Sequence, residues 1–197
     1  MRIDRRRLSL PGIPENHIGI MIVTETKLAG VYVIQPQRFE DERGFFATSF
    51  SAAEFASRGM ANSFVENNFS FSKSRGTLRG IHYQTPPYGQ DKLVRCTRGA
   101  IFDVVVDLRP GSPTFKQWFG VELTAANRSM VYLPGDCGHG FQTMEDGTEV
   151  FYMVSQPYAP ASSSGVRWND PAFGIQWPDE GHRIILDRDQ AYSDFPL

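Results

Sequence analysis

The stretch from Gly76 to Gln84 carries three polar side chains, Arg79, His82 and Gln84, among small or apolar neighbours. Side chains two residues apart share a face in an extended strand, so His82 and Gln84 point the same way. Arg79 has the opposite parity and reaches that face only through a bend or bulge at Gly80. An arginine, a histidine and a glutamine at the mouth of a β-structure suit an anionic, oxygen-rich ligand.

A second histidine lies in the glycine-rich segment 135–141, which follows a predicted strand end at Leu133. Its three glycines allow close approach of the backbone and leave His139 as the one functional side chain of the turn. A lone histidine in a turn is most often structural. Two histidine motifs on separate strands of one small β-domain nevertheless favour a site.

Short strand-like runs separated by Gly- and Pro-rich turns predict an all-β fold, a sandwich or barrel with a few short helices. The strongest run, residues 100–108, places Phe102, Val104, Val106 and Leu108 on one face of a strand. The other predicted strands are two around the turn at Ala29-Gly30, and residues 64–72, 92–96, 118–123, 130–133 and 149–154.

The predicted strand at residues 64–72 has one polar and one aromatic face, with Glu66 and Asn68 on the polar one. If that face points to solvent, these two side chains carry no function. If it points into a barrel, they contact a ligand. The sequence leaves both interpretations open.

The charged run at residues 39–44 contains Arg43 and is typical of a turn. After this turn, Phe45 and Phe46 are expected to re-enter the core. Arg43 is then either a solvated turn residue or a ligand contact.

A short helix is predicted after this turn. Ser51 followed three residues later by Glu54 forms a capping box, in which each side chain satisfies a free backbone N–H of the first turn. Gly59 is expected to end the helix.

The chain has 197 residues, enough for one domain with a full core, and a formal net charge of −2. This small net charge produces no overall electrostatic attraction to nucleic acid or to a membrane surface. No apolar run is long enough for a membrane span or for the apolar part of a signal peptide. Two cysteines without a disulfide framework fit a reducing cytoplasm. Residues 21–197 are therefore expected to form one cytoplasmic domain.

Residues 1–20 combine the basic run Arg5-Arg6-Arg7 with Gly, Pro and Asn, and are expected to be a disordered tail. Because Met21 opens a strand-like run, the same residues could instead reflect the choice of start codon.

Taken together, these segments resemble the dTDP-4-dehydrorhamnose 3,5-epimerase family of nucleotide-sugar enzymes. The resemblance runs from about Met21 to the C-terminus and rests on seven segments in family order. They are residues 41–46, 78–84, 91–94, 102–109, 134–141, 168–171 and 175–178. The family implies a cupin-type jelly roll that forms homodimers through its β-sheets, binds a dTDP-linked sugar, and uses no metal or cofactor.

The resemblance also implies roles for individual residues. His82 matches the catalytic base, and Asp170, in a Trp-Asn-Asp-Pro motif, matches the carboxylate paired with it. Tyr152 matches the acid on the opposite face of the sugar, and Lys92 the residue beside the developing enolate. The implied substrate contacts are Arg43, Phe46, Glu66, Asn68, Arg79, Gln84, His139 and Arg188. Arg43 is expected to contact the diphosphate. In one arrangement it extends across the dimer and contacts the diphosphate bound to the other subunit.

The implied reaction is epimerisation of an NDP-4-keto-6-deoxyhexose, as in conversion of dTDP-4-dehydro-6-deoxy-D-glucose to dTDP-4-dehydro-L-rhamnose. The protons on C3 and C5 are acidic because both carbons lie beside the C4 ketone. A histidine with a pKa near neutrality can remove such a proton, and a carboxylate on its other nitrogen fixes the tautomer. A lysine stabilises the enolate oxygen, and a tyrosine returns a proton from the opposite face.

The chain departs from the family pattern at three positions. Thr48 and Ser163 stand where the family usually has glutamate, and Glu66 stands where it prefers glutamine. These changes leave open which nucleotide sugar is bound. They also leave open whether C3 alone, or both C3 and C5, are inverted.

Three other functions fit the sequence less well. A ketoisomerase acting on a related NDP-sugar would use the same base. A metal-dependent cupin usually needs two or three histidines and a carboxylate around one ion, whereas only His82 and His139 are well placed. A sugar-nucleotide-binding cupin without activity would explain the lost glutamates, but not the retained set of His82, Asp170, Tyr152 and Lys92.

Overall fold

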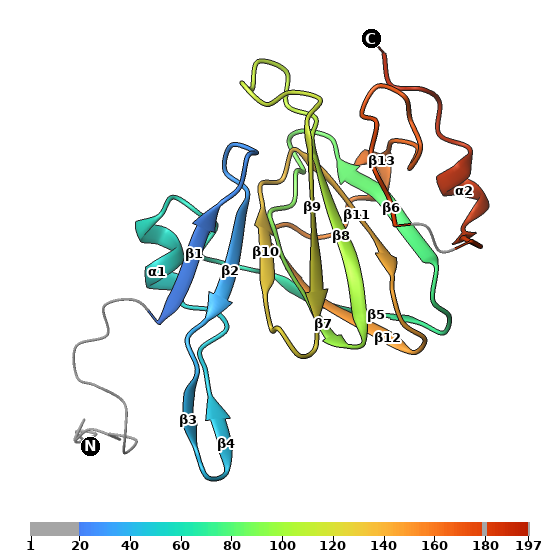
Figure 1. Cartoon of the computed structure of the whole chain (residues 1–197). Coiled ribbons are helices and arrows are strands. Elements are labelled where there is room, and N and C mark those ends of the chain that lie inside the picture. The colour runs from blue at the N-terminus through green and yellow to red at the C-terminus, as the bar shows by residue number, and fades with distance from the viewer. Residues whose placement is uncertain (1–19, 179–180, 197) are drawn as a thin grey trace.

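The computed structural model describes residues 20–178 and 181–196, and its strands form two large sheets and a separate hairpin (Figure 1). Sheet 1 has the order β1 (Met21–Glu25), β2 (Tyr32–Pro36), β10 (Met130–Leu133), β7 (Lys92–Arg98), β12 (Thr148–Val154) and β5 (Glu66–Ser72). Sheet 2 has the order β13 (Ser163–Gly165), β6 (Thr77–Gln84), β11 (Cys137–Thr143), β8 (Ala100–Asp107) and β9 (Trp118–Thr124), and β14 (Ile184–Ile185) pairs with β6. The hairpin consists of β3 (Phe39–Asp41) and β4 (Gly44–Phe46).

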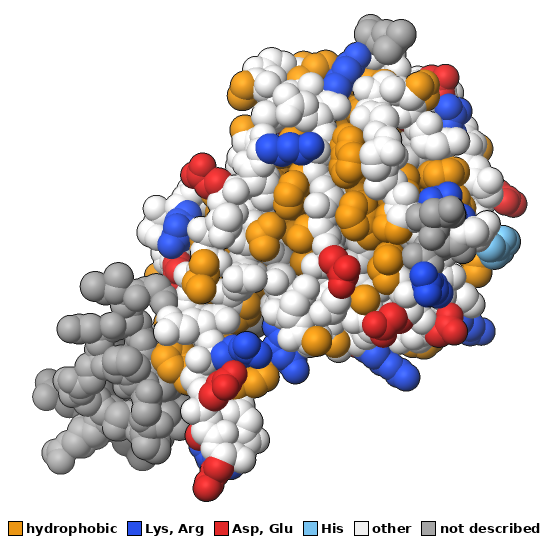
Figure 2. All heavy atoms as spheres, viewed as in Figure 1, with side chains coloured by type: hydrophobic (Ala, Val, Ile, Leu, Met, Phe, Trp, Pro, Cys, Tyr) orange, Lys and Arg blue, Asp and Glu red, His pale blue; other side chains and the backbone are white. Residues whose placement is uncertain are grey.

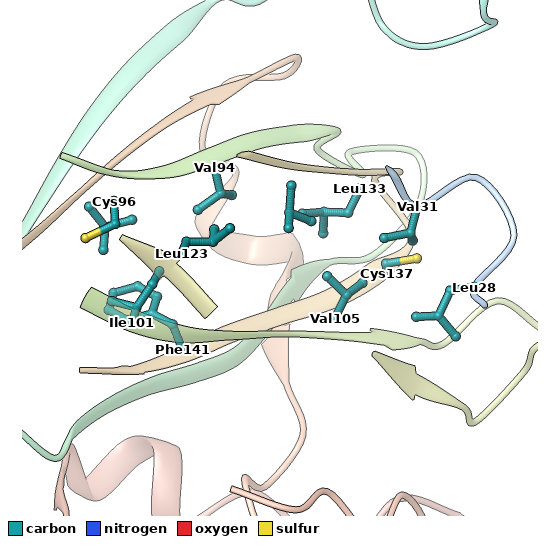
Figure 3. Close-up of a cluster of buried hydrophobic side chains, with 12 residues drawn as sticks. Leu28, Val31, Val94, Cys96, Ile101, Val105, Leu123, Leu133, Cys137 and Phe141 are labelled. Atoms are coloured by element: carbon teal, nitrogen blue, oxygen red, sulfur yellow. The ribbon is translucent and has the colours of Figure 1, made fainter. Parts of the chain in front are cut away.

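The main core lies between the two sheets, as Figure 3 shows. Sheet 1 contributes Val94 and Leu133, and sheet 2 contributes Val105, Leu123 and Phe141. Apart from a 3₁₀ turn at Pro160–Ser162, the described helices are α1 (Ala52–Ser57) and α2 (Asp187–Gln190). The fold is therefore the predicted all-β, cupin-type jelly roll with a few short helices.

The outer face of sheet 2 is covered by the C-terminal part of the chain. Val104, Val106 and Leu108 form a second buried cluster with Val166 and Phe173, and this confirms the predicted apolar face of β8. Figure 2 shows hydrophobic side chains over the region of β8 and β9. Phe102 in β8 and Trp118 in β9 are only partly buried.

Helix α1 covers part of the outer face of sheet 1. Ser51 caps the helix by accepting a hydrogen bond from the Glu54 N–H at 3.4 Å, which confirms the predicted start. Phe55 is fully buried and packs against Leu93 and Tyr132. The helix thus seals one half of the outer face and leaves the half formed by β12 and β5 uncovered by any described helix.

Strand β5 turns its polar face inward and its aromatic face outward. Ser70 lines the cavity between the sheets, and Glu66 and Asn68 share its parity. Phe69 and Phe71 point the other way and are 68% and 50% exposed.

The expectation that Phe45 and Phe46 re-enter the core is wrong, because both lie on the projecting β3–β4 hairpin and are 40% and 51% exposed (Figure 1). The hairpin pairs only with itself among the described strands, so nothing folds these rings back onto the main core.

Strand β6 contains the predicted bulge at Gly80. Arg79 is opposite Phe141 and His82 is opposite His139, so three steps along β6 match two steps along β11. The extra residue brings Arg79 and His82 to the same side despite their opposite parity, and both line the cavity.

Glycine is the only residue type that fits this bulge at position 80. Its φ is +116°, and a Cβ there would lie 2.6 Å from the Gly140 Cα and 2.7 Å from the His139 carbonyl oxygen. The two backbones therefore touch where the two histidines are brought together.

The predictions for residues 1–20 fall outside the described residues, except at Ile20. No helix among the described residues is long and apolar enough to cross a membrane.

Gly80→Ala should destabilise the protein by about 2–4 kcal/mol in urea unfolding, because the new methyl group meets backbone that cannot move aside. Gly174→Ala is the matched control, since Gly174 also has positive φ (+60°) but has no atom within 4 Å of the added carbon. We expect this control to lose only about 1–2 kcal/mol. Equal losses in the two variants would show that steric contact with β11 is unimportant.

Candidate active site

A cavity of about 540 Å³ lies between the two sheets and takes side chains from both of them. Sheet 2 contributes His82 and His139, and sheet 1 contributes Lys92 and Tyr152. The predicted site residues that line it are Arg79, His82, Gln84, Lys92, His139, Tyr152 and Arg188.

The imidazole of His82 is paired with Asp189, a residue of helix α2. The His82 Nε2 atom lies 2.7 Å from the Asp189 Oδ1 atom, and the Gly80 N–H donates to Oδ2 at 3.3 Å. Burial alone would raise the pKa of the Asp189 carboxyl, but its hydrogen bonds to His82 and Gly80 and the charge of His82 lower it overall. With Nε2 held by a carboxylate, the other ring nitrogen of His82 is left to act as a base.

The predicted pairing of His82 with Asp170 is therefore wrong. Asp170 is buried, and its two carboxylate oxygens accept the Ala172 N–H at 2.9 Å and the Phe195 N–H at 2.6 Å. It closes the turn after Trp168 and ties the C-terminal segment to the outer face of sheet 2, outside the cavity lining. An aspartate that precedes a proline commonly has such a turn-forming role.

A second histidine–carboxylate pair joins His139, which lines the same cavity, to Asp103. The His139 Nε2 atom is 2.8 Å from Asp103 Oδ2, and both residues are buried. His139 lies within strand β11 rather than in the predicted turn, because the surrounding glycines let β11 pack closely against β6. The remaining oxygen of Asp103, Oδ1, is buried and has no hydrogen-bond partner among the described residues.

Lys92 projects into the cavity from β7 and is buried. Burial lowers the pKa of its ammonium group to about 8, and the charge of Asp103 opposes a further fall. Lys92 is therefore largely cationic at neutral pH and can stabilise a negative oxygen in the cavity.

Tyr152 reaches the cavity from β12, next to Lys92 on the same wall. Burial raises the pKa of its phenol, the charge of Arg79 opposes this rise, and Glu66 adds to it. The phenol is thus protonated at neutral pH and can act as a proton donor.

Two cationic side chains surround the opening. Arg79 donates to the Ser72 hydroxyl at 3.2 Å and to the Phe71 carbonyl at 3.1 Å, which holds its guanidinium between β6 and β5. Arg188 lies beside Asp189, with 3.6 Å between its Nε and the carboxylate. Both can bind an anionic ligand.

Gln84, a predicted substrate contact, is bound to the surrounding loops instead. It donates to the carbonyls of Tyr88 and Pro157 and accepts the Ala159 N–H at 2.7 Å. Both amide protons are therefore used by backbone, and Gln84 shapes the wall of the cavity without a free donor.

Four predicted substrate contacts lie outside the cavity lining: Arg43, Phe46, Glu66 and Asn68. Glu66 and Asn68 are on the inward face of β5, and Asn68 lies opposite Tyr152. Arg43 and Phe46 lie on the projecting hairpin. The Arg43 side chain is 83% exposed and donates to the carboxylate of Asp41 at 2.5 Å and 3.2 Å.

No group of three or more His, Cys, Asp or Glu side chains in the described part of the chain is arranged to hold a metal ion. The two histidines of the cavity are each held by their own carboxylate, through Asp189 and Asp103. This arrangement suits proton transfer.

Comparison with known proteins places the chain among nucleotide-sugar epimerases. A sequence model of the dTDP-4-dehydrorhamnose 3,5-epimerase family matches residues 25–196. The chain belongs to this family. The dTDP-4-dehydrorhamnose 3,5-epimerase of Escherichia coli is 42% identical over 171 residues, which cover 86% of this chain and 92% of the relative. The predicted family, cupin fold and epimerase class are thus confirmed.

Two solved structures show the same likeness. The crystal structure of dTDP-4-dehydrorhamnose 3,5-epimerase from Elizabethkingia anophelis has a TM-score of 0.87 and 36% identity, and covers 90% of this chain and 97% of its own. ChmJ from Streptomyces bikiniensis, a 3'-monoepimerase solved with dTDP-quinovose, has a TM-score of 0.80 and 37% identity, covering 86% and 85%. Structures similar to this chain therefore include both a 3,5-epimerase and a 3'-monoepimerase.

Sequence reasoning missed Asp189 and Asp103. Asp189 lies 107 residues from His82, in a segment with weak helix signals, and no periodic pattern connects the two. Asp103 could have been found, because an aspartate between Phe102 and Val104 in an apolar strand is expected to have a buried partner.

Asp189→Asn should lower kcat about a hundredfold or more, because an amide can donate to Nε2 and leave the base in the wrong tautomer. Asp170→Asn is the matched comparison, since Asp170 is equally buried but holds only backbone. It should cost about 1–3 kcal/mol of stability and leave kcat of the folded protein nearly unchanged. Steady-state kinetics together with thermal unfolding would distinguish loss of activity from loss of stability in the two variants. A greater loss of kcat in Asp170→Asn than in Asp189→Asn would support the pairing of His82 with Asp170.

Proposed function

We propose that the cavity binds an NDP-4-keto-6-deoxyhexose, linked to dTDP, and inverts the configuration at C3 and C5 through an enolate without a cofactor. The proposal is supported by membership of the 3,5-epimerase family and by the two His–carboxylate pairs of the cavity. The observation that carries it is the position of base and acid on opposite walls. His82 projects from sheet 2 and Tyr152 from sheet 1.

A flat sugar ring held between these walls presents one face to His82 and the other to Tyr152. The free ring nitrogen of His82 removes the proton from the carbon beside the ketone, and the electron pair of the C–H bond moves to the C4 oxygen. Lys92 stabilises this oxyanion, because an ammonium group in a dry site interacts strongly with a developing charge.

Inversion requires a proton on the opposite face of the same carbon. The Tyr152 hydroxyl donates it, and the electron pair of the enolate re-forms the ketone. Asp189 stabilises the imidazolium of His82 during this step. Return of a proton from the imidazolium to the phenolate, through solvent, restores both groups.

The diphosphate would be bound by arginines. Arg79 and Arg188 are already at the cavity, whereas Arg43 lies on the hairpin away from it. We propose that the hairpin enters the cavity opening of a second copy, so that Arg43 and Phe46 contact the nucleotide bound there. The exposed rings of Phe69 and Phe71, next to the half-buried Phe151, provide an apolar face for such a homodimer.

The range of sugars accepted depends on the altered positions. Ser163, which replaces a usual glutamate of the family, lines the cavity, so this change alters the binding surface directly. The proposal favours inversion at both carbons, and inversion at C3 alone, as in the 3'-monoepimerase ChmJ, is the second candidate. A cytoplasmic location is part of the proposal, and the two buried free cysteines fit it.

The proposal is tested by proton NMR of dTDP-4-keto-6-deoxyglucose in deuterated buffer, with the C3 and C5 signals followed separately. The protein should exchange both protons for deuterium and form the inverted product. Tyr152→Phe should still exchange a proton but invert about a hundredfold more slowly, because the base remains and the acid is lost. His82→Asn should abolish exchange. Exchange at C3 alone would select the monoepimerase, and no exchange in the wild-type protein would refute the proposal.

The crossing of the hairpin is tested by mixing two inactive or weakened variants. Arg43→Ala should weaken dTDP-sugar binding about tenfold or more, because it removes a bidentate diphosphate contact. Co-expression of Arg43→Ala with His82→Asn in one mixed dimer should restore one complete site, at about half of the activity per dimer. If Arg43 served the site of its own chain, each mixed dimer would instead have one site without the base and one site without the arginine, and its activity would not exceed that of the Arg43→Ala protein.

A further inference from the structure

The β3–β4 hairpin has no backbone pairing with either large sheet, so side-chain contacts must set its direction. Phe45, in the middle of β4 and opposite Glu40, makes such contacts. The guanidinium of Arg128 lies 4.8 Å from its centroid and that of Arg38 lies 5.7 Å from it. Both distances fall within the range of a cation–π contact. Figure 2 shows basic side chains beside the point where the hairpin leaves the body.

Arg128 is presented by a rigid turn between β9 and β10. The amide oxygen of Asn127 accepts the N–H groups of Thr124 and Ser129, and its amide nitrogen donates to the Glu122 carbonyl. Arg128 itself has a φ of +56°, a conformation that a residue with a side chain rarely adopts. The turn therefore holds Arg128 in one direction, at a cost in backbone strain.

The Arg128 side chain is directed at a hollow of about 330 Å³ between the hairpin and sheet 1. Phe45, Arg38, Arg95 and Arg128 all line this hollow. Burial lowers the pKa of the Arg95 guanidinium, and the nearby positive charge of Arg128 lowers it further. Like charges at this distance repel, and the contacts of the arginines with aromatic rings oppose this repulsion. Arg38 also lies 3.7 Å from the carboxylate of Glu40. The Arg95 guanidinium makes a separate cation–π contact, 5.0 Å from the centroid of the Phe151 ring.

We propose that Arg128 is a positioning residue that acts through Phe45 to set the direction of the hairpin, and thereby the position of Arg43 at the nucleotide. This inference rests on the proposed function, in which Arg43 binds the diphosphate in a second copy. Arg128 touches neither the sugar nor the reacting atoms. It helps to fix a segment that has no backbone pairing with the large sheets, so its loss weakens nucleotide binding and leaves the proton transfers intact.

The test is a double-mutant cycle between Arg128→Gln and Arg43→Ala, measured by KM, kcat and calorimetric Kd for dTDP. Arg128→Gln should raise KM and Kd about threefold to fivefold, the effect of one cation–π contact, with kcat within a factor of about two. In the Arg43→Ala background it should add no further increase. Arg128→Lys should restore most of the affinity, because a lysine ammonium also binds a ring face.

Arg58→Gln is the matched control, since Arg58 is an exposed arginine at the end of α1 that pairs with Glu54 rather than with an aromatic ring of the hairpin. It should change neither KM nor Kd. An equal increase from Arg128→Gln in both backgrounds, a parallel fall in kcat and Tm, or no effect at all would overturn the proposal. Absence of proton exchange in the wild-type protein would instead refute the proposed function, while the dTDP affinities would still report on Arg128.

Discussion

The site depends on the contact between the backbones of β6 and β11. Gly80 meets Gly140 so closely that a methyl group has no room there, and the same glycine bulges β6 by one residue. The bulge turns Arg79 and His82 into the same cavity, and the free N–H of Gly80 binds the carboxylate that orients His82. One backbone constraint thus sets the direction of the base, of a cationic contact, and of the partner of the base.

The charges of the cavity are arranged in layers between the two sheets. Each imidazole has its own carboxylate, so Asp189 serves His82 and Asp103 serves His139. The charge of Asp103 also opposes the effect of burial, which lowers the pKa of Lys92. Two further positive side chains, Arg79 and Arg188, line the cavity and suit it to an anionic ligand.

Local patterns predicted much of this structure. The apolar face of β8, the N-cap at Ser51 and the bulge at Gly80 follow from periodicity, side-chain hydrogen bonding and the freedom of glycine, which act over a few residues. The partner of His82 could not be found in this way, because Asp170 and Asp189 are both acidic residues in turns and only the folded chain brings one of them to the imidazole. The exposed position of Phe45 and Phe46 also escaped prediction, since their hydrophobicity alone suggests a core.

The origin of Asp189 in the short helix α2 makes the site depend on a segment that follows every described strand. Strands β6, β7, β11 and β12, which carry His82, Lys92, His139 and Tyr152, all precede this helix in the chain. A chain shortened before α2 would therefore retain every described strand and lose the carboxylate that holds the His82 imidazole.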